Sequence, residues 1–478
     1  MKESRELVII GGGPAGMSAA ISASNCGVDV LLLDQREAPG GQIYRRVESP
    51  AVADPTLLGN DYLQGLNLVT LFRESTVDYR PDTVVWEVSP GREVYVYGGP
   101  GPGVIEARRV ILATGAVERS IPVPGWTLPG VMTAGGAQSL IKNDGLLPEV
   151  PLVLAGTGPL LLLLACQYLD MGVEIAAVLE TTPRSNLKRA MAHLPGAIMS
   201  GGYLTKGAGM LSRLRRARVR HVRGVEALRA VGSDHLQQIE FHAGGREHRL
   251  GASLLLLHQG VVPDVNLASA VGCALEWDSG SLCFKPSVDQ WGNSSVEGVA
   301  VVGDGAGIVG ADSAKWFGEM AGLDAACQLG YIGANARDTL AQKSRNLYRR
   351  SLGIRPFLEA LYRPPDAYRI PVDPDVVICR CEEVTAETVR AQIGRGARDP
   401  NAIKSRTRCG MGPCQGRYCG LTLSEIIATE TGQKISEVGY FRLRPPVKPV
   451  PISAILELAT GEMPVETALP DPTVKPLS

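Results

Sequence analysis

The sequence predicts an α/β protein with two parallel-sheet domains, followed by a small cysteine-rich domain. Two glycine-rich turns, at residues 11–16 and 156–161, each follow an apolar segment of strand length and precede a helical pattern. Alternation of strands and helices indicates parallel sheets, because a parallel connection needs a crossover. Five of the ten cysteines fall between positions 379 and 419. A length of 478 residues fits two or three domains.

The composition of the chain limits the kinds of partner that it is expected to bind. The chain is 45% hydrophobic and 20% charged, with a net charge of -1. Such a charge gives no bulk attraction to nucleic acid or an anionic membrane, so we expect no nucleic-acid partner and at most peripheral membrane association. The opening MKESRELVIIGGGPAG lacks a signal-peptide layout, and the apolar run at 160–165 is too short to span a bilayer. We therefore expect a cytoplasmic protein.

The first glycine turn, GGGPAG at 11–16, lies between the strand-like LVII and a helical pattern, and the next strand-like segment ends on Asp34. In such a turn Gly11 allows the tight bend, Gly13 lets a pyrophosphate approach the backbone, and Gly16 lets the helix pack on the strand. The helix N-terminus donates amides to the phosphates. Asp34 is placed to bond the ribose hydroxyls. This pattern predicts a Rossmann-like site for FAD or NAD.

Two later segments favour FAD. One strand-like segment ends in Ala113-Thr114-Gly115 and another in Gly303-Asp304. In order and spacing, residues 5–330 resemble the flavoproteins with two dinucleotide domains, which include the pyridine nucleotide–disulfide reductases. The resemblance implies that Asp304 contacts the ribityl and pyrophosphate region. It places FAD contacts at Gly11, Gly13, Pro14, Ala15, Gly16, Asp34, Gly41, Gln42, Thr114, Gly115, Gly303 and Asp304.

The second glycine turn departs from the pattern. It keeps Gly156 and Gly158, and the following strand-like segment ends on Glu180, but Leu161 occupies the third glycine position. A leucine there should push the helix from the strand or reshape the phosphate pocket. Three interpretations stay open: a vestigial element, a site for another adenine nucleotide held by Gly156, Gly158 and Glu180, or a working NAD(P)H site. Residues 1–330 contain no CxxC or CxxxxC pair, which argues against disulfide reduction.

A strongly basic segment, SRLRRARVRHVR, begins at residue 212. Its alternation predicts a strand with one solvated basic face. No aromatic residues nearby offer a base-stacking surface, so we do not interpret it as a nucleic-acid site.

The C-terminal cysteines predict a metal centre. Cys379 and Cys381 form a CxC pair at the end of a strand-like segment, while Cys409, Cys414 and Cys419 have four residues between neighbours. Soft thiolates fit a [2Fe–2S] cluster or structural zinc, and zinc more often uses CxxC knuckles. A site without metal is the remaining alternative. Thr385 is expected to cap the helix that follows the CxC pair.

Residues 375–430 resemble the bacterioferritin-associated-ferredoxin-like [2Fe–2S] domain, which uses a CxC pair and two later cysteines. The resemblance implies that the ligands are Cys379, Cys381, Cys414 and Cys419. Cys409 is an alternative ligand, or a free thiol beside the cluster.

These features divide the chain into six segments. The expected segments are an FAD-binding domain at 1–118 with a return segment at 291–335, a second dinucleotide-binding-like domain at 119–290, a helical segment and linker at 336–374, a [2Fe–2S] domain at 375–435 and a Pro-rich tail at 436–478.

The whole layout resembles the alpha-type (A-type) flavoprotein subunits of heteromeric amine and amino-acid dehydrogenases. That family includes D-hydroxyproline dehydrogenase, opine oxidase, dye-linked proline dehydrogenase and hydrogen cyanide synthase. The resemblance is carried by GGGPAG, DQREAPGGQIYR, ATGAVERSIPVPGW, AGTGPLLLLLA, LETTP, CRCEEVT and TRCGMGPCQGRYCG.

The resemblance implies an electron-transfer role. A beta-type partner subunit with its own FAD would oxidise the amine, with a small third subunit, FMN at a subunit interface, and a quinone or other acceptor as further expectations. No catalytic residue is assigned in this chain. The alternatives are a self-sufficient NAD(P)H-dependent flavoprotein reductase and a non-enzymatic iron–sulfur sensor or scaffold.

Overall fold

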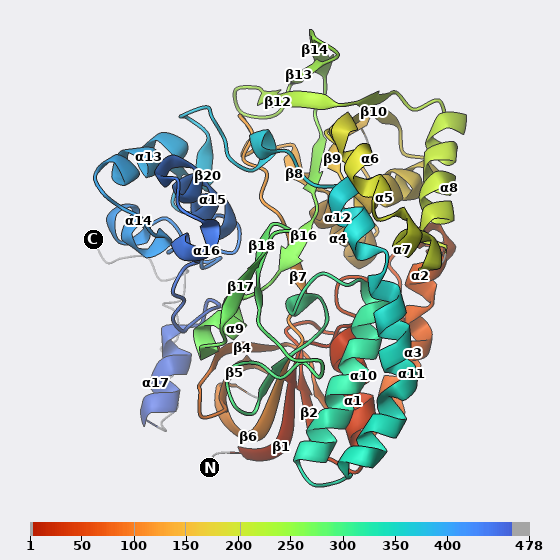
Figure 1. The fold of residues 1–478 in the computed structure, drawn as a ribbon, viewed down its shortest axis with the longest axis vertical. Helices are drawn as coiled ribbons and strands as arrows, with labels where there is room; N and C mark the ends of the chain where they lie inside the picture. Colours follow the sequence, from red (N-terminus) through yellow and green to blue (C-terminus); the bar gives the residue numbers. More distant parts are fainter. Residues whose placement is uncertain (1–2, 100, 149, 201, 461–478) are drawn as a thin grey trace, which may run out of the picture.

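The computed structural model describes residues 3–99, 101–148, 150–200 and 202–460. The part of the expected Pro-rich tail from residue 461 onward lies outside these residues. Two sheet-containing domains lie end to end along the longest axis, and the cysteine-rich domain sits beside their junction (Figure 1). The largest buried cluster joins the first domain to the helices of the second.

The first sheet has the strand order β3-β2-β1-β6-β5-β4, with β19 also paired to β6. Strands β1, β2, β3, β6 and β19 run parallel, whereas β4 and β5 continue the sheet in antiparallel pairs. The last four residues of β1 are all buried, as expected for a parallel strand covered on both faces. The bounds are β1 Glu3–Ile10, β2 Val30–Leu33, β3 Asp78–Arg80, β4 Thr83–Val88, β5 Glu93–Gly98, β6 Gly103–Leu112 and β19 Val299–Val301.

Helix α1 packs against α10 through small residues. A methyl group added at Gly318 would lie 2.0 Å from the carbonyl oxygen of Ala15, and one added at Gly322 would lie 2.3 Å from that of Ala19. Only glycine permits this close crossing, which holds the start of α10 near the first glycine turn. Helix α11 covers α10 (Figure 1). The helical segments here are α1 Pro14–Ser24, η1 Pro55–Leu58, α2 Asn60–Leu63, α3 Gly65–Arg73, η2 Gly303–Gly305, α10 Ala311–Gln328 and α11 Ala334–Leu352.

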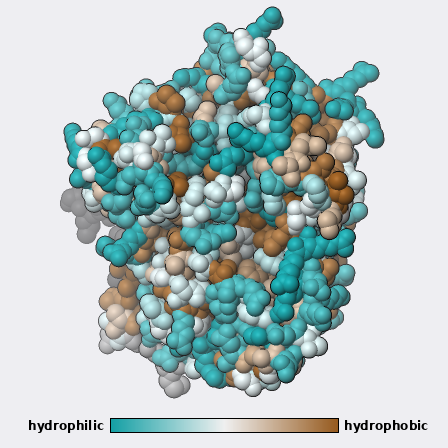
Figure 2. All heavy atoms as spheres, viewed as in Figure 1, coloured by the Kyte–Doolittle hydropathy of each residue, from teal (hydrophilic) through white to brown (hydrophobic). Residues whose placement is uncertain are grey.

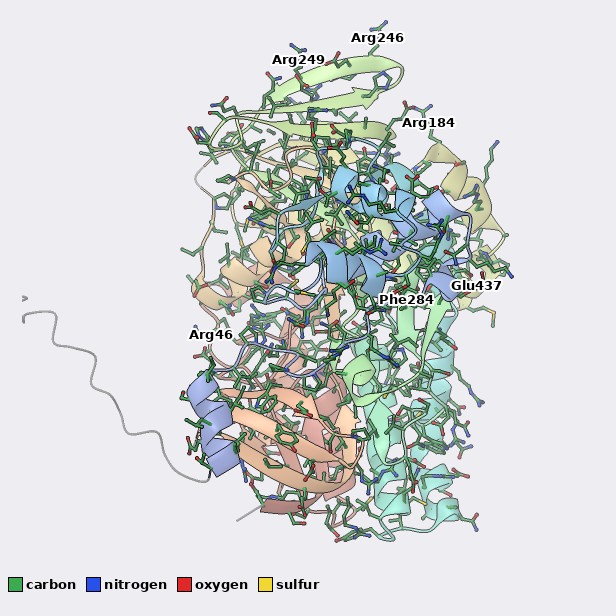
Figure 3. The ribbon with its side chains drawn as sticks, turned by 90° about the vertical axis from the view of Figure 1, so that its left-hand side faces the viewer. Arg46, Arg184, Arg246, Arg249, Phe284 and Glu437 are labelled. Carbon is green, nitrogen blue, oxygen red and sulfur yellow. The ribbon has the colours of Figure 1, made fainter. Side chains whose placement is uncertain are left out.

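The second sheet is parallel, with the order β11-β10-β9-β15-β8. An antiparallel sheet, β12-β13-β14, extends from it, and Figure 3 shows Arg246 and Arg249 of β14 at its outer end. The strands are β8 Val131–Thr133, β9 Leu152–Thr157, β10 Ile175–Glu180, β11 His221–Arg223, β12 Val225–Val231, β13 Gln238–Ala243, β14 Arg246–Gly251 and β15 Leu255–Gln259. The helices are α4 Ala134–Asp144, α5 Pro159–Asp170, α6 Arg184–Met191, α7 Leu194–Met199 and α8 Tyr203–Arg216.

The basic segment that begins at residue 212 is mainly not a strand, so that prediction was wrong. Its first five residues end helix α8, and only 221–223 pair as β11. Leu211 and Leu214 lie three residues apart, and Leu214 is buried while Leu211 packs against the core. Helical spacing of these leucines outweighs the alternation of arginines, whose charged ends point away from any core in either structure.

Short strand pairs and a helix connect the domains. Strands β7 Ala116–Glu118 and β16 Val261–Pro263 pair between the two large sheets. Next to them lie α9 Asn266–Val271 and the hairpin of β17 Leu275–Asp278 and β18 Cys283–Pro286. Helix α12 Arg355–Leu361 and η3 Asp366–Tyr368 then lead to the cysteine-rich domain, and the Tyr368 hydroxyl donates to the carbonyl of Val225.

The cysteine-rich domain has its own core. It contains β20 Val377–Cys379, β21 Val384–Thr385, α13 Ala386–Gly394, α14 Pro400–Thr407, α15 Gly420–Thr431 and α16 Ile435–Val438. Thr385 caps α13, as predicted, by accepting a hydrogen bond from the Thr388 amide. Beyond this domain the chain returns to the first sheet, where the Val447 amide donates to Trp86 and α17 Ile452–Thr460 follows.

The face seen in Figure 2 is mostly hydrophilic, with apolar side chains gathered over α5 and α7. Exposed apolar residues near there include Leu187, Met191, Ile198 and Met199. Among the described residues, no helix combines the length and apolarity that a bilayer crossing requires.

Candidate functional site

The first glycine turn is shaped for close backbone contacts. Gly11 has φ +110°, and a methyl group on Gly16 would lie 1.9 Å from the Gly11 carbonyl oxygen. Gly13, the N-cap of α1, is not crowded in this way. The nearest atom to a methyl group added there is the Gly41 Cα, 3.8 Å away. The space beside Gly13 thus remains open at a helix N-terminus, where a phosphate binds.

Asp34 follows β2 and lies directly beside the turn. Its Oδ2 accepts a hydrogen bond from the Gly12 amide at 2.8 Å, and its Oδ1 accepts one from the Arg36 amide at 3.0 Å. Burial raises the pKa of the Asp34 carboxyl, and the two amides oppose that shift. An ionised carboxylate has about four acceptor positions, so Asp34 keeps capacity for ribose hydroxyls.

The other predicted FAD contacts converge on this edge of the first sheet. Gly303 faces Ala15, with an added methyl group 2.7 Å from the Ala15 Cβ. Asp304 Oδ1 accepts hydrogen bonds from the Val309 and Gly310 amides. The loop containing Gly41 and Gln42 lies over the turn, and Thr114 and Gly115 follow β6. The structure therefore brings Gly11, Gly13, Pro14, Ala15, Gly16, Asp34, Gly41, Gln42, Thr114, Gly115, Gly303 and Asp304 to one region.

Two buried basic residues beside this region escaped sequence reasoning. Lys142 donates to the carbonyl oxygens of Gln42 at 3.2 Å and Ile43 at 3.0 Å, and Arg45 donates to the Gln42 side chain at 2.7 Å. Burial, helped by the charge of Arg45, lowers the pKa of Lys142 to about 7. Among the described residues neither forms an ion pair with a carboxylate. The sequence offers a signal for Arg45, which lies three residues after the Gly40-Gly41-Gln42 motif. It offers none for Lys142, which is far from that motif in sequence.

Three thiols meet in the core of the cysteine-rich domain. The sulfur atoms of Cys379, Cys409 and Cys419 lie within 4.8 Å of one another, and all three residues are buried. Hydrogen bonds from the Cys409 and Cys419 thiols, and from the amides of Gly410 and Glu382, lower the pKa of Cys379 to about 2. The same contacts raise the pKa of Cys409 and Cys419. The three thiols are thus in direct hydrogen-bonding contact with one another.

Cys381 and Cys414 complete the group. Their side chains are hydrogen-bonded to each other. Burial raises the pKa of Cys381, and the nearby Cys379 raises it further. A methyl group on Gly412 would lie 2.3 Å from the Cys381 Cβ, so the later loop packs directly on the CxC turn. Five thiols with amide donors around them fit an iron–sulfur cluster. Both Cys409 and Cys419 have their sulfur atoms within 4.8 Å of that of Cys379, and the choice of four ligands stays a prediction.

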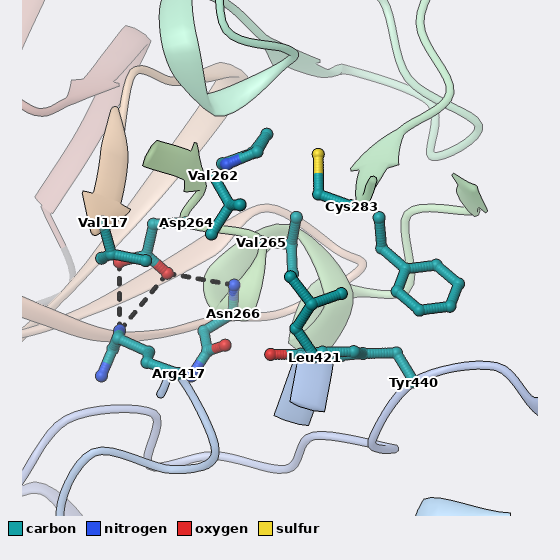
Figure 4. A pocket seen from close by; sticks show the side chains of 11 residues that line it. Val117, Val262, Asp264, Val265, Asn266, Cys283, Arg417, Leu421 and Tyr440 are labelled. Carbon is teal, nitrogen blue, oxygen red and sulfur yellow. Dashed lines mark hydrogen bonds and ion pairs between the residues drawn. The ribbon is translucent and has the colours of Figure 1, made fainter. Parts of the chain in front are cut away.

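Residues 264–266 join the two candidate cofactor regions. The Asp264 amide donates to Gly115, and its carbonyl oxygen accepts from the Thr114 hydroxyl at 3.1 Å. Its carboxylate accepts from Arg417 Nε at 3.0 and 3.3 Å, and Asn266 Nδ2 donates to the Gln415 carbonyl at 2.9 Å. Figure 4 shows the Asp264–Arg417 contacts. Thr114 and Gly115, which are predicted to contact FAD, are thereby connected to the loop that carries Cys414 and Cys419.

Aromatic side chains support this junction. Phe284 of β18 lies 5.5 Å from Tyr440, measured between ring centroids, and 5.1 Å from Trp277. Figure 3 places Phe284 just below the cysteine-rich domain. A cavity of about 20 Å³ lies between the β16–β18 region and the cysteine-rich domain (Figure 4). It is lined by Val262, Cys283, Arg417 and Tyr440 among others. The volume suits at most one water molecule, so the two domains are in close contact there.

We expect Asp264→Asn to loosen the docking of the cysteine-rich domain. The Asp264 and Arg417 side chains are 13% and 11% exposed, and breaking a buried pair leaves an uncompensated charge at a cost of about 3 kcal/mol. The variant should unfold at lower urea concentration and be cut faster by trypsin after Arg369, in the segment between α12 and β20. Asp61→Asn, which breaks an exposed pair with Lys206, is the control. Equal protease resistance in Asp264→Asn and wild type would contradict this prediction.

The second glycine turn packs closely against His258 of the neighbouring strand β15. A methyl group on Gly156 would lie 1.7 Å from the His258 carbonyl oxygen, and the His258 ring faces Gly158. Leu161 is buried in the core. Burial would raise the pKa of Glu180, but His221 and Arg223 outweigh it and lower that pKa. Thus Gly156, Gly158 and Glu180 lie along one sheet edge, yet each contacts neighbouring residues of the chain.

Comparisons with known proteins agree with this architecture. Residues 5–327 match the family described as pyridine nucleotide-disulphide oxidoreductase, and residues 376–458 match the sarcosine oxidase A3 domain. The chain is 42% identical over 467 residues to the A-type subunit of opine oxidase from Rhizobium meliloti, covering 96% of this chain and 88% of the relative. It is 32% identical to hydrogen cyanide synthase subunit HcnB of Pseudomonas protegens, covering 94% and 96%.

Solved structures show the same fold. L-proline dehydrogenase from P. horikoshii aligns with a TM-score of 0.68 at 21% identity, over 95% of this chain and 80% of that one. Thioredoxin reductase from T. acidophilum aligns with a TM-score of 0.51 at 18% identity, over 68% of this chain and 99% of that one. The predicted fold class, two dinucleotide-binding domains with a small C-terminal cysteine-cluster domain, is confirmed.

Proposed function

Because the chain belongs to the pyridine nucleotide-disulphide oxidoreductase family, and within it to the group of A-type opine oxidase subunits, we propose that it transfers electrons in a heteromeric amine or amino-acid dehydrogenase. It is an oxidoreductase of a flavin-dependent family. The proposal adds that FAD lies at the first glycine turn, that a [2Fe–2S] cluster lies among the C-terminal cysteines, and that the location is cytoplasmic.

The observation that carries the proposal is the short connection between the two cofactor regions. Gly13, Asp34 and Asp304 would hold FAD, and Cys379, Cys381, Cys414 and Cys419 would hold the cluster. When bound, FAD accepts two electrons and a [2Fe–2S] cluster passes electrons singly. Asp264 contacts Thr114 and Gly115 on one side and Arg417 on the other. These residues hold the flavin-binding loop and the cluster-binding loop in fixed contact.

We propose that a partner subunit, rather than this chain, oxidises the amine substrate. Relatives named as opine oxidase and hydrogen cyanide synthase subunits support the presence of other subunits. We propose a beta-type FAD subunit that dehydrogenates the amine, a small third subunit, FMN at a subunit interface, and a quinone or other acceptor. Candidate amines are opines, D-hydroxyproline, proline and sarcosine.

The test is reduction of the purified complex under anaerobic conditions. The chain is co-expressed with its neighbouring reading frames, and each candidate amine is added while flavin absorbance and the paramagnetic signal of the reduced cluster are recorded. We expect one amine to reduce both centres only when the partner is present. NADH or NADPH is the control and should leave the flavin oxidised. Reduction of the isolated chain by either nucleotide would instead support the reductase alternative. A chain that contains iron but no FAD would support the sensor alternative.

A further inference from the structure

The two glycine turns differ in what lies beside their second glycine. In the first turn, a methyl group added at Gly13 would meet only the Gly41 Cα, at 3.8 Å. In the second, one added at Gly158 would lie 3.3 Å from His258 Nε2 and 3.4 Å from its Cδ2. The pyrophosphate of a dinucleotide approaches the backbone at this second glycine. The imidazole of His258 therefore stands where a phosphate group would bind.

The position of the His258 ring is fixed by buried contacts. Its Nδ1 lies 2.7 Å from Glu118 Oε1, and the Gly135 amide at the start of α4 donates to Glu118 Oε2 at 2.8 Å. The His258 side chain is 2% exposed and that of Glu118 is 10% exposed. Turning the ring away would leave Glu118 Oε1 buried without its hydrogen-bond partner, which is unfavourable. The ring is thus a permanent part of this sheet edge.

Three other parts of the second glycine turn and its sheet edge also contact residues of this chain. Glu180, which would bond a ribose, accepts a hydrogen bond from His221 Nε2 at 3.0 Å and lies 3.4 Å from Arg223 Nε. Thr157 and Thr182 are hydrogen-bonded across the same edge at 2.6 Å. Leu161, in place of the third glycine, is 1% exposed. The positions for phosphate and ribose therefore both contact side chains of this chain.

We propose that the second dinucleotide-binding-like domain binds no adenine nucleotide, and that His258, held by Glu118, fills its phosphate position. The residues do not fit the NAD(P)H that this fold family implies. The His258–Glu118 pair instead ties β15 to β7 and to the start of α4, and so stabilises the connection between the domains. This inference concerns the second domain alone and does not depend on the proposed electron-transfer function.

The first test measures nucleotide binding to the FAD-saturated full-length protein. NAD⁺, NADH, NADP⁺, NADPH, ADP and ATP are each added at a concentration of about 1 mM, at which a ligand with a Kd of about 10 µM would raise the melting temperature clearly. We expect no change in melting temperature, no heat in titration calorimetry, and FAD as the sole nucleotide released on denaturation. Saturable binding of any one of these nucleotides, with FAD still bound, would overturn the proposal.

The second test uses His258→Ala without added nucleotide. If the ring fills the site, its removal leaves a cavity and removes the hydrogen-bond partner of Glu118 Oε1, so the melting temperature should fall by several degrees. His242→Ala is the matched control, because His242 forms a similar pair with Glu226 on the surface. It should leave the melting temperature unchanged. A His258→Ala protein that is as stable as wild type would overturn the proposal, because the imidazole would then not be part of the packed structure.

Discussion

Replacing Cys379 with serine is expected to abolish the iron–sulfur cluster while FAD content stays normal. Cys379 is 1% exposed, and its sulfur accepts hydrogen bonds from two thiols and two backbone amides. A serine oxygen is a harder and weaker ligand for iron, and its shorter bond to Cβ would not reach the same position. Iron and acid-labile sulfide should fall to background, and the visible spectrum should become that of a simple flavoprotein.

Cys283→Ser is the control for this experiment. Cys283 is also buried, but it lies outside the cysteine group and should keep a normal iron content. Normal iron in Cys379→Ser would refute the ligand assignment. On the proposed ligand set, Cys409→Ser also keeps its cluster, whereas serine at Cys414 or Cys419 loses it. Loss in Cys409→Ser with retention in Cys419→Ser would exchange the roles of these two residues.

The second prediction with a large expected effect concerns two glycines of the first turn. Alanine at Gly13 should weaken FAD binding, whereas alanine at Gly16 should destabilise the fold. Gly13→Ala is expected to fold, because its φ of -76° suits any residue and an added methyl group meets nothing closer than 3.8 Å. The methyl group would occupy the space of the pyrophosphate, so we expect FAD affinity to fall by roughly tenfold or more. The measurement is FAD content and the Kd for FAD of the apoprotein.

Gly16→Ala should instead impair the fold. Its methyl group would lie 1.9 Å from the Gly11 carbonyl oxygen, so β1 and α1 would have to separate. We expect low soluble yield and a reduced melting temperature even with excess FAD. Gly209→Ala is the control, because Gly209 also lies in a helix and a methyl group added there would meet no atom within 4 Å. Equal FAD affinity in Gly13→Ala and wild type would show that the pyrophosphate does not pass beside Gly13.

The sequence predicted those parts of the site that depend on local order. The first glycine turn and Asp34 belong to one strand–helix–strand unit, so their spacing alone places them together. The CxC pair and the three later cysteines were likewise found by spacing. The expectation of a strand at residue 212 failed because arginines alternate by chance on the exposed part of α8, while the buried leucines follow the helical period.

Contacts between distant segments could not be predicted. Asp264 and Arg417 are separated by 153 residues, and His258 and Glu118 by 140. Neither pair belongs to a local motif, and each residue taken alone is an ordinary surface or core candidate. Their pairing follows from how β7, β15 and the cysteine-rich domain meet, which is a property of the assembled fold.

The return of the C-terminal segment to the first sheet has a consequence for biosynthesis. Val447 is 1% exposed and bonded to Trp86, and β19 and α10 complete the same domain from the middle of the chain. The first glycine turn is thus synthesised before β19, α10 and the segment around Val447, which complete the domain around it. Until β19 and α10 have been synthesised, the apolar edge of β6 and one side of α1 remain uncovered, which leaves nascent chains open to aggregation or to chaperones. We therefore expect FAD to bind only after these later segments have folded onto the first domain.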